Sequence, residues 1–344
     1  MRRQGGPVLN VVRDPQAGAI APELDAFLDG LSGPTIFHLP GRDPTRVRVV
    51  AGGLHGNEPS GLRAIHRLLC TGQRPAVDVF LFVGAVEAAR TEPRLSFRML
   101  PGRRDLNRCF RPPFDDLDGR TAAAALDLLS ARVPEAVVDL HNNTGHNPAY
   151  GIASRVDPHR LHLVGLFAPR LIRSGLCLGT FMEAFDSLAP AVTIECGRAG
   201  DSAADATAYA GLVRLCELER LDPVFISPEP LMILADPVRV CLRWGSTLAF
   251  FGQPLPGVDL TLDPEIDRHN FEAVAHGTRL GWLGPDVPWP LEACDESGQD
   301  VSRDLFEEQD GELRTKVTLV PIMMTTDEVA ARNDCLFYAV HRRQ

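Results

Sequence analysis

The chain has 344 residues, of which 44% are hydrophobic and 23% are charged, as in an ordinary globular protein. This length exceeds that of one small domain and predicts two domains. The formal net charge of −10 argues against a nucleic-acid-binding protein, which usually carries a basic surface.

The sequence shows neither an export signal nor a disulfide pattern. The opening MRRQGGPVLNVV lacks the apolar core of a signal peptide, and no apolar run is long enough to cross a membrane. The eight cysteines are scattered, and no two of them form a Cys-x-x-Cys pair. Free thiols without an export signal are typical of the cytoplasm. We therefore expect a cytoplasmic protein with no nucleic-acid or membrane partner.

Strands and helices are predicted to alternate over the first part of the chain. Apolar runs predict strands at 34–39, around 47–50, and at 77–83, 136–140, 151–154 and 191–194. Helical spacing of apolar residues predicts helices at 59–70, 121–129, 159–172 and 203–221. This alternation predicts an α/β fold with helices on both faces of the sheet.

The composition changes near residue 222. Prolines at 223, 228 and 230 discourage a helix there. Short apolar runs follow at 247–251, 316–322 and 335–340, separated by Gly, Pro and Asp. We predict a first domain of residues 1–222 and a smaller, mostly β domain of residues 223–344.

The stretch VRVVAGGLHGNEPSG, residues 47–61, carries the first chemical signal. Its valines predict a buried strand, two glycines break it, and His55 and Glu58 follow. Pro59 suits the first turn of a helix because its missing N–H would be unpaired there. Imidazole and carboxylate are ordinary zinc ligands, and a catalytic zinc needs three protein ligands and an open position for water. The pair is therefore a candidate half of a metal site.

The His-x-x-Glu spacing alone is not specific. His269 and Glu272 repeat it, and His276 would share their face if that segment were helical. An isolated pair is also explained by a hydrogen-bonded histidine beside a surface glutamate. The downstream motifs therefore decide which pair is a metal site.

A second histidine stands at the end of a predicted strand, in VVDLHNNT, residues 137–144. Ligands gather at the carboxyl ends of strands in α/β sheets, so His141 could meet the His55 loop there. Asp139 lies two residues earlier on the same strand face and is placed to orient an imidazole. The alternative is a strand-end histidine that is bonded to the backbone.

A glutamate follows the predicted strand at 191–194, in the motif TIECG, residues 193–197. A carboxylate in such a place is partly desolvated, which raises its pKa towards the range of a general base. The alternative for Glu195 is a surface position just past the strand.

Arginines are concentrated between the first and second predicted helices. This local excess suits an anionic substrate, because the arginine fork matches a carboxylate with two hydrogen bonds. Asn107 and Arg108 can both donate to one carboxylate, although a solvated basic loop is the alternative. The arginines are Arg94, Arg98, Arg103, Arg104, Arg108 and Arg111.

In chain order, the motifs HGNE (55–58), RDLNR (104–108), DLH (139–141) and ECG (195–197) resemble those of the succinylglutamate desuccinylase/aspartoacylase family. This family of zinc hydrolases is related to the zinc carboxypeptidases, and the similarity covers about residues 35–220. The resemblance implies a zinc-carboxypeptidase-like mixed sheet flanked by helices, with residues 1–222 as the catalytic domain. It also implies one Zn²⁺ per chain, held by His55, Glu58 and His141.

The resemblance also assigns roles to residues outside the metal site. It implies that Glu195 is the general base and acid and that Asn107 and Arg108 hold a substrate carboxylate. The family has an arginine shortly before its DLNR-type motif that polarises the scissile carbonyl. Arg98 is the best match, and Arg103 and Arg104 are alternatives.

The function that we expect is zinc-dependent hydrolysis of the amide bond of a small, anionic N-acyl amino acid. One alternative is a peptidase of the zinc carboxypeptidase type, which needs an open groove for a polypeptide. The other is a metal-binding homologue without catalytic activity. The sequence does not specify the acyl group or the oligomeric state.

Overall fold

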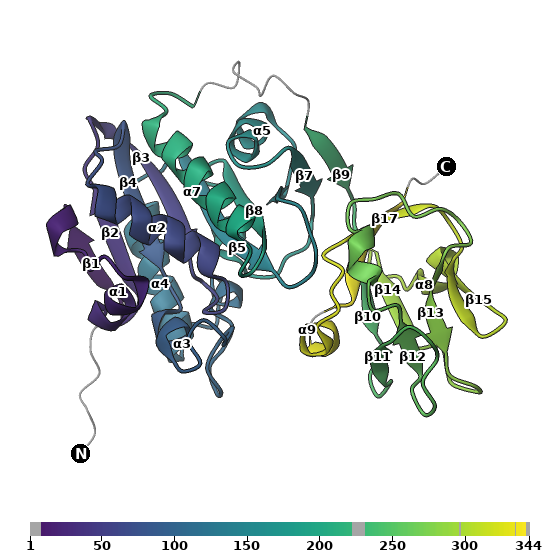
Figure 1. The fold of residues 1–344 in the computed structure, drawn as a ribbon. Coiled ribbons are helices and arrows are strands. Elements are labelled where there is room, and N and C mark those ends of the chain that lie inside the picture. Colours follow the sequence, from purple (N-terminus) through teal and green to yellow (C-terminus); the bar gives the residue numbers. More distant parts are fainter. Residues whose placement is uncertain (1–7, 222–230, 296, 334, 342–344) are drawn as a thin grey trace. The chain divides into compact units, whose positions relative to one another are not determined.

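The structure is a computed structural model that describes residues 8–221, 231–295, 297–333 and 335–341. The chain divides into two compact units, and it passes between them more than once (Figure 1). The predicted boundary at residues 222 and 223 lies outside the described residues, as do the three prolines near it. Unit 1 comprises Met1–Asn142, Ala149–Ile172 and Leu176–Ile233, and unit 2 comprises Asn143–Pro148, Arg173–Gly175 and Leu234–Gln344.

A nine-stranded mixed sheet of order β1-β2-β4-β3-β5-β8-β6-β7-β9 forms the centre of the first part of the fold. Strand β3 is parallel to β4 and β5, whereas β2 is antiparallel to β4 and β6 is antiparallel to β8. The predicted α/β fold with a mixed sheet is therefore confirmed. The strands are β1 (Asn10–Arg13), β2 (Thr35–Leu39), β3 (Asp43–Gly52), β4 (Val77–Val83), β5 (Ala136–Asn143), β6 (Tyr150–Ala153), β7 (Arg170–Arg173), β8 (Ala191–Arg198) and β9 (Met232–Ala235).

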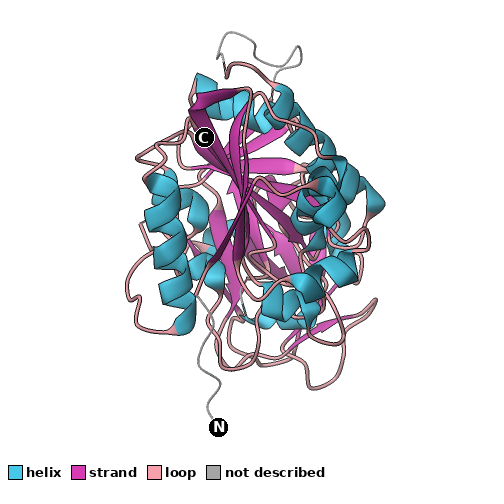
Figure 2. Ribbon diagram, turned by 90° about the vertical axis from the view of Figure 1, so that its left-hand side faces the viewer, coloured by secondary structure: helices cyan, strands magenta, loops and turns pink. Residues whose placement is uncertain are grey.

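Helices cover both faces of this sheet, as Figure 2 shows for the strands of unit 1. One buried core joins the sheet to α1, α2, α3, α5 and α7, and a second core joins the other face to α4 and α6. The helices are α1 (Leu24–Gly30), α2 (Pro59–Thr71), α3 (Val86–Arg90), α4 (Leu117–Ser130), α5 (Pro158–Gly165), α6 (Phe181–Phe185) and α7 (Ser202–Glu217), with 3-10 turns η1 (Ala17–Ala19) and η2 (Leu106–Arg108).

Helix α2 illustrates how the sequence places the candidate site. Its apolar residues, among them Leu62 and Ile65, recur at helical spacing and are buried in the core. A Cβ at Gly61 would lie 2.8 Å from the Cβ of Leu140, so the helix can approach β5 this closely only without a side chain there. The first turn of α2 is thereby held against the end of β5.

The bounds of several predicted elements differ in the structure, and two of these differences change the interpretation. The helix predicted at 159–172 is wrong in its second half, because α5 ends at Gly165 and Arg170–Arg173 form strand β7. Pro169 separates the two, since a proline disfavours helical backbone in the residue before it. Strand β8 extends to Arg198, so Glu195 lies within the strand rather than beyond it.

Unit 2 has its own core and is mostly β, as the sequence predicts. Its two sheets have the orders β14-β10-β18-β17 and β11-β12-β13-β16-β15. Phe306 and Phe337 lie in its core with their rings edge to face. The elements are β10 (Val238–Leu242), β11 (Leu248–Phe250), β12 (Leu260–Leu262), η3 (Ile266–His269), β13 (Arg279–Leu283), β14 (Leu291–Cys294), α8 (Ser302–Leu305), β15 (Phe306–Gln309), β16 (Glu312–Thr315), β17 (Leu319–Ile322), α9 (Glu328–Asn333) and β18 (Phe337–His341).

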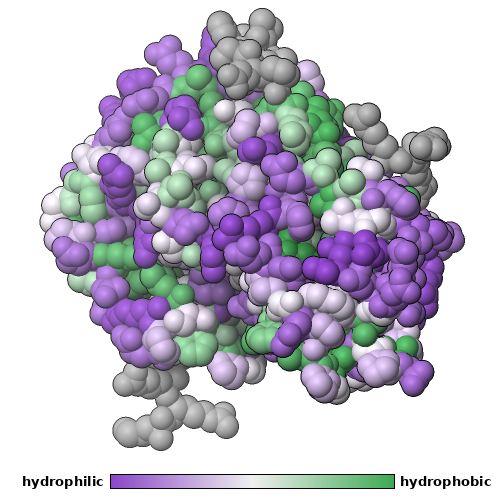
Figure 3. All heavy atoms as spheres, turned by 45° about the vertical axis from the view of Figure 1, so that its right-hand side comes forward, coloured by the Kyte–Doolittle hydropathy of each residue, from purple (hydrophilic) through white to green (hydrophobic). Residues whose placement is uncertain are grey.

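Large hydrophobic side chains are concentrated in these three cores. On the face drawn in Figure 3, hydrophilic and hydrophobic residues are interspersed. Among the described residues, no helix combines the length and the hydropathy that a membrane crossing requires.

Candidate functional site

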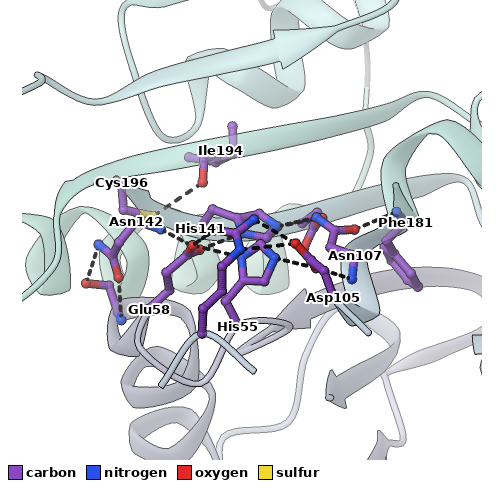
Figure 4. A network of polar contacts seen from close by, with 12 residues as sticks. His55, Glu58, Asp105, Asn107, His141, Asn142, Phe181, Ile194 and Cys196 are labelled. Atoms are coloured by element: carbon purple, nitrogen blue, oxygen red, sulfur yellow. Dashed lines mark hydrogen bonds and ion pairs between the residues drawn. The ribbon is translucent and has the colours of Figure 1, made fainter. Parts of the chain in front are cut away.

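Three side chains from separate segments of unit 1 meet at the carboxyl ends of β3 and β5. His55 lies in the turn after β3, Glu58 directly precedes α2, and His141 lies near the end of β5. Nδ1 of His55 is 2.7 Å from Oε1 of Glu58, and Nδ1 of His141 is 2.6 Å from Oε2 (Figure 4). The three candidate ligand atoms lie within 4.8 Å of one another, and all three residues are buried.

Each of the two histidines contacts a second carboxylate through its other ring nitrogen, Nε2. Nε2 of His55 lies 2.8 Å from Oδ1 of Asp105, and Nε2 of His141 lies 2.8 Å from Oδ2 of Asp139. A metal-binding histidine usually donates its other ring N–H to such a carboxylate, which fixes the tautomer and the ring orientation. Both Nδ1 lone pairs can therefore face one cation, as the donor set of a metal site requires.

The electrostatics of the three residues also suit a cation. Burial alone would raise the pKa of the Glu58 carboxyl, but His55 and His141 hold it well below its ordinary value. Burial opposes a charge on His141, yet Asp139 and Glu58 raise its pKa well above the ordinary value. The buried carboxylates of Glu58 and Asp139 thus stabilise a positive charge between them. Two imidazoles and one carboxylate match the three-ligand set of a catalytic zinc, with a fourth position left for water.

The alternative ligands in unit 2, His269, Glu272 and His276, do not form such a group. The turn η3 ends at His269, so the helical face that would align Glu272 and His276 with it is absent. Glu272 and His276 are exposed. Within the described part of the chain, His55, Glu58 and His141 form the one group of three or more potential ligands.

Glu195 projects from β8, the strand that lies beside β5 in the sheet. Its neighbours Ile194 and Cys196 point to the opposite face and into the core with α2 and α7. Oε2 of Glu195 is buried without a hydrogen-bond partner among the described residues. Burial raises the pKa of Glu195 to about 7, while His141, His55 and Arg98 act in the opposite direction. An unpaired carboxyl with this pKa is suited to proton transfer near neutral pH.

The three candidate arginines have different surroundings. Arg98 donates from Nη1 to Glu58 over 3.2 Å and from Nη2 to Asp105 over 2.9 Å, which places its guanidinium beside the metal ligands. Arg103 instead pairs with Asp118 and Glu87.

Arg104 pairs with Asp116, near the start of α4. Of the three arginines, Arg98 is the one whose guanidinium contacts a candidate metal ligand. The role predicted for it remains a prediction.

Asn107 and Arg108 point in different directions. The Asn107 amide is buried, donates to Asp139 over 3.3 Å and accepts the Phe181 N–H over 2.8 Å. Arg108 is half-buried, and its Nη1 donates to the Asn107 carbonyl over 2.9 Å. No carboxylate in the described ranges forms an ion pair with Arg108. The predicted contact of both residues with one substrate carboxylate stays a prediction, and Arg108 is the one with unused donors.

The family follows from a comparison with known protein families. Residues 44–214 match the model of the succinylglutamate desuccinylase/aspartoacylase catalytic domain. The chain belongs to this family. Its buried His–Glu–His group is typical of the zinc sites of succinylglutamate desuccinylases and aspartoacylases.

Solved structures with a similar fold include members of this family. A succinylglutamate desuccinylase/aspartoacylase from Rhodobacter sphaeroides is 15% identical, with 90% of this chain and 88% of that chain covered and a TM-score of 0.55. The product-bound ectoine utilization protein EutE of Ruegeria pomeroyi is 18% identical over 90% and 88% of the chains, with a TM-score of 0.57. Murine aminoacylase 3 is 20% identical over 87% and 96%, with a TM-score of 0.51. No curated protein matches the chain.

Two residues of this desuccinylase/aspartoacylase-like site are not assigned by the sequence analysis. Asp105 stands among the arginines of residues 94–111, and its carboxylate contacts His55 and caps the turn η2 by accepting the Asn107 N–H. A signal was available, because each metal-binding histidine needs a carboxylate or carbonyl partner. The side chain of Asn142 is the second, and no sequence pattern indicates its bonds.

Proposed function

We propose that the protein is a zinc-dependent hydrolase that cleaves the amide bond of a small N-acyl amino acid. The observation that carries this proposal is the buried, unpaired Glu195 carboxyl beside the His55–Glu58–His141 group. A protein that only binds a metal ion has no need for such a group. Burying an unpaired carboxyl costs free energy, so its presence is best explained by proton transfer.

Zinc bound by His55, Glu58 and His141 would supply Lewis acidity and lower the pKa of a bound water from about 15.7 to about 7. Glu195 accepts a proton from the water while the water oxygen adds to the acyl carbon. As the carbon–nitrogen bond breaks, Glu195 returns that proton to the nitrogen. The products are a carboxylic acid and the free amine of the amino acid, so the proton count balances.

Arg98 is the residue that we assign to the scissile carbonyl. Its guanidinium is held beside the metal ligands by Glu58 and Asp105, so it is pre-oriented before substrate arrives. A donor fixed in this way stabilises the negative charge that develops on the carbonyl oxygen. Such donors commonly contribute about 3 to 4 kcal/mol to transition-state stabilisation.

Arg108 is the residue that we assign to the substrate carboxylate, because its guanidinium has donors that the protein leaves unused. We expect Arg108→Lys to raise KM for carboxylate substrates about tenfold with a smaller effect on kcat, because lysine keeps the charge but loses the planar fork. Steady-state kinetics would measure this. Arg104→Lys is the matched control, since Arg104 pairs with Asp116 away from the site, and an equal rise in both variants would contradict the assignment.

The names of the similar structures support a small amide as the substrate. They include succinylglutamate desuccinylase/aspartoacylase and aminoacylase, which are names of enzymes that act on small amides. A test is to compare kcat/KM for N-acetylaspartate, N-succinylglutamate and singly charged N-acyl amino acids with values for a set of short peptides. We expect the N-acyl amino acids to be the better substrates. A preference for peptides would indicate a carboxypeptidase-type enzyme instead.

A further inference from the structure

The N-terminus of α2 has an unusual cap. Glu58 occupies the N-cap position, where a side chain normally accepts a hydrogen bond from one of the first helical N–H groups. The Glu58 carboxylate makes no such bond, because it faces His55 and His141. An unpaired N–H at this buried helix end would be costly. Another residue must therefore supply the missing acceptor.

Asn142 supplies it from the neighbouring strand β5. Its Oδ1 accepts the Ser60 N–H over 2.9 Å, and its Nδ2 donates to Ser60 Oγ over 2.9 Å and to the Gly197 carbonyl over 3.0 Å. Its own backbone N–H donates to Oε2 of Glu58 over 3.2 Å (Figure 4). With 4% of its surface exposed, Asn142 has its side-chain amide fully used in these bonds.

Asn142 and its hydrogen-bond partners are close in sequence to the functional residues. Asn142 directly follows His141, and the residues that it binds each lie two positions from a functional side chain. Ser60 lies two residues after Glu58, and Gly197 lies two residues after Glu195. One side chain thus links the strand of one metal ligand to the helix that follows another and to the strand of the proposed base.

The network continues away from the site and is anchored there. Ser60 Oγ donates to Oδ1 of Asp205 on α7 over 2.6 Å, and Arg63 Nη1 donates to Oδ2 of the same carboxylate over 2.7 Å. These bonds hold the Ser60 hydroxyl in the orientation that accepts from Asn142. The Ser60 partner of Asn142 is therefore held in place by α2 and α7 together.

We propose that Asn142 is a positioning residue that sets the separation of Glu58 and His141 and so sets the metal affinity of the site. This role rests on metal binding by these ligands, and it holds whatever reaction the site performs. Partners of this kind around a metal site typically contribute about 10- to 100-fold to metal affinity.

The test compares zinc affinity in two matched variants. Asn142→Leu keeps the branched shape at a somewhat larger volume and removes the three side-chain bonds. Asn270→Leu makes the same change in unit 2, where Asn270 is 5% exposed and its amide donates to the carbonyls of His146, Asp267 and Met324 and accepts the Met324 N–H. Zinc affinity is measured by competition with a chromogenic chelator, and stability is measured by thermal unfolding without metal.

We expect Asn142→Leu to bind zinc about 10- to 100-fold more weakly than the wild type, and Asn270→Leu to bind it equally well although it is also destabilised. If Asn142→Leu does not fold, Asn142→Ser replaces it, because serine is too short to reach both Ser60 and Gly197. Wild-type affinity in the Asn142 variant, or an equal loss in the Asn270 variant, would overturn the role of Asn142. A wild-type protein that binds no zinc would overturn the metal site as well.

Discussion

Replacement of Glu195 by glutamine should lower kcat by about 10²-fold or more while the protein keeps its zinc. Glutamine has nearly the same shape as glutamate but cannot accept and return a proton. The carboxyl is not one of the three metal ligands, so metal content should stay unchanged. Steady-state kinetics and metal analysis of the same preparation measure both quantities. A variant with wild-type kcat and bound zinc would remove Glu195 from the mechanism.

The same replacement should make the metal-free protein more stable at high pH. Burial raises the pKa of Glu195 to about 7 in the folded protein, so the ionised form destabilises the fold. This cost is absent below the ordinary pKa of a glutamate, grows as the pH rises towards 7, and is complete above it. Glutamine removes the cost, which corresponds to up to about 3 kcal/mol.

Urea unfolding of both metal-free proteins at pH 4 and pH 8 would show this difference. The glutamine variant should be the more stable one at pH 8, and the two should converge at pH 4. A variant that is less stable than the wild type at pH 8 would show that the Glu195 carboxyl is well solvated or paired, against the structure.

The second large effect is expected from His141→Ala, which should abolish high-affinity zinc binding and with it the activity. The loss of affinity should exceed the roughly 100-fold that an outer partner contributes, because a direct ligand is removed. The metal-free variant should also lose stability. Without the imidazole, the buried carboxylates of Glu58 and Asp139 lose the group that holds positive charge between them.

His269→Ala is the control for this experiment, because His269 has the same spacing to Glu272 that His55 has to Glu58. It should leave zinc content and kcat/KM unchanged. Metal analysis after dialysis distinguishes the two outcomes. Zinc that survives in His141→Ala but is lost in His269→Ala would move the metal site to the second domain.

The sequence predicts the elements that carry the metal ligands because local patterns determine them. The strand β5, which carries His141, is buried along its length, and α2, which Glu58 directly precedes, has a regular apolar spacing with Pro59 in its first turn. By contrast, Leu171 and Ile172 continue the apolar pattern of α5 but belong to β7. A short apolar run fits a helix or a strand equally well, so its neighbours in the sheet decide.

The contacts within the site were predictable only in part. The pairing of Asp139 with His141 follows from their places on one strand, and the structure has it at 2.8 Å. The pairing of Asp105 with His55 joins residues 50 positions apart and depends on how the loop before η2 folds back. Asn107 shows the same limit, because its place beside Arg108 in the sequence does not reveal that its amide turns inward to Asp139.

The most direct test of the proposed function is a zinc titration of the metal-free protein. The protein is stripped with a chelator, zinc is added back in steps, and hydrolysis of its best N-acyl amino acid substrate is measured at each step. We predict no turnover without zinc and a linear rise that levels off at one equivalent per chain, as a single three-ligand site requires. Full turnover in the metal-free protein, or bound zinc without hydrolysis of any N-acyl amino acid, would contradict the account.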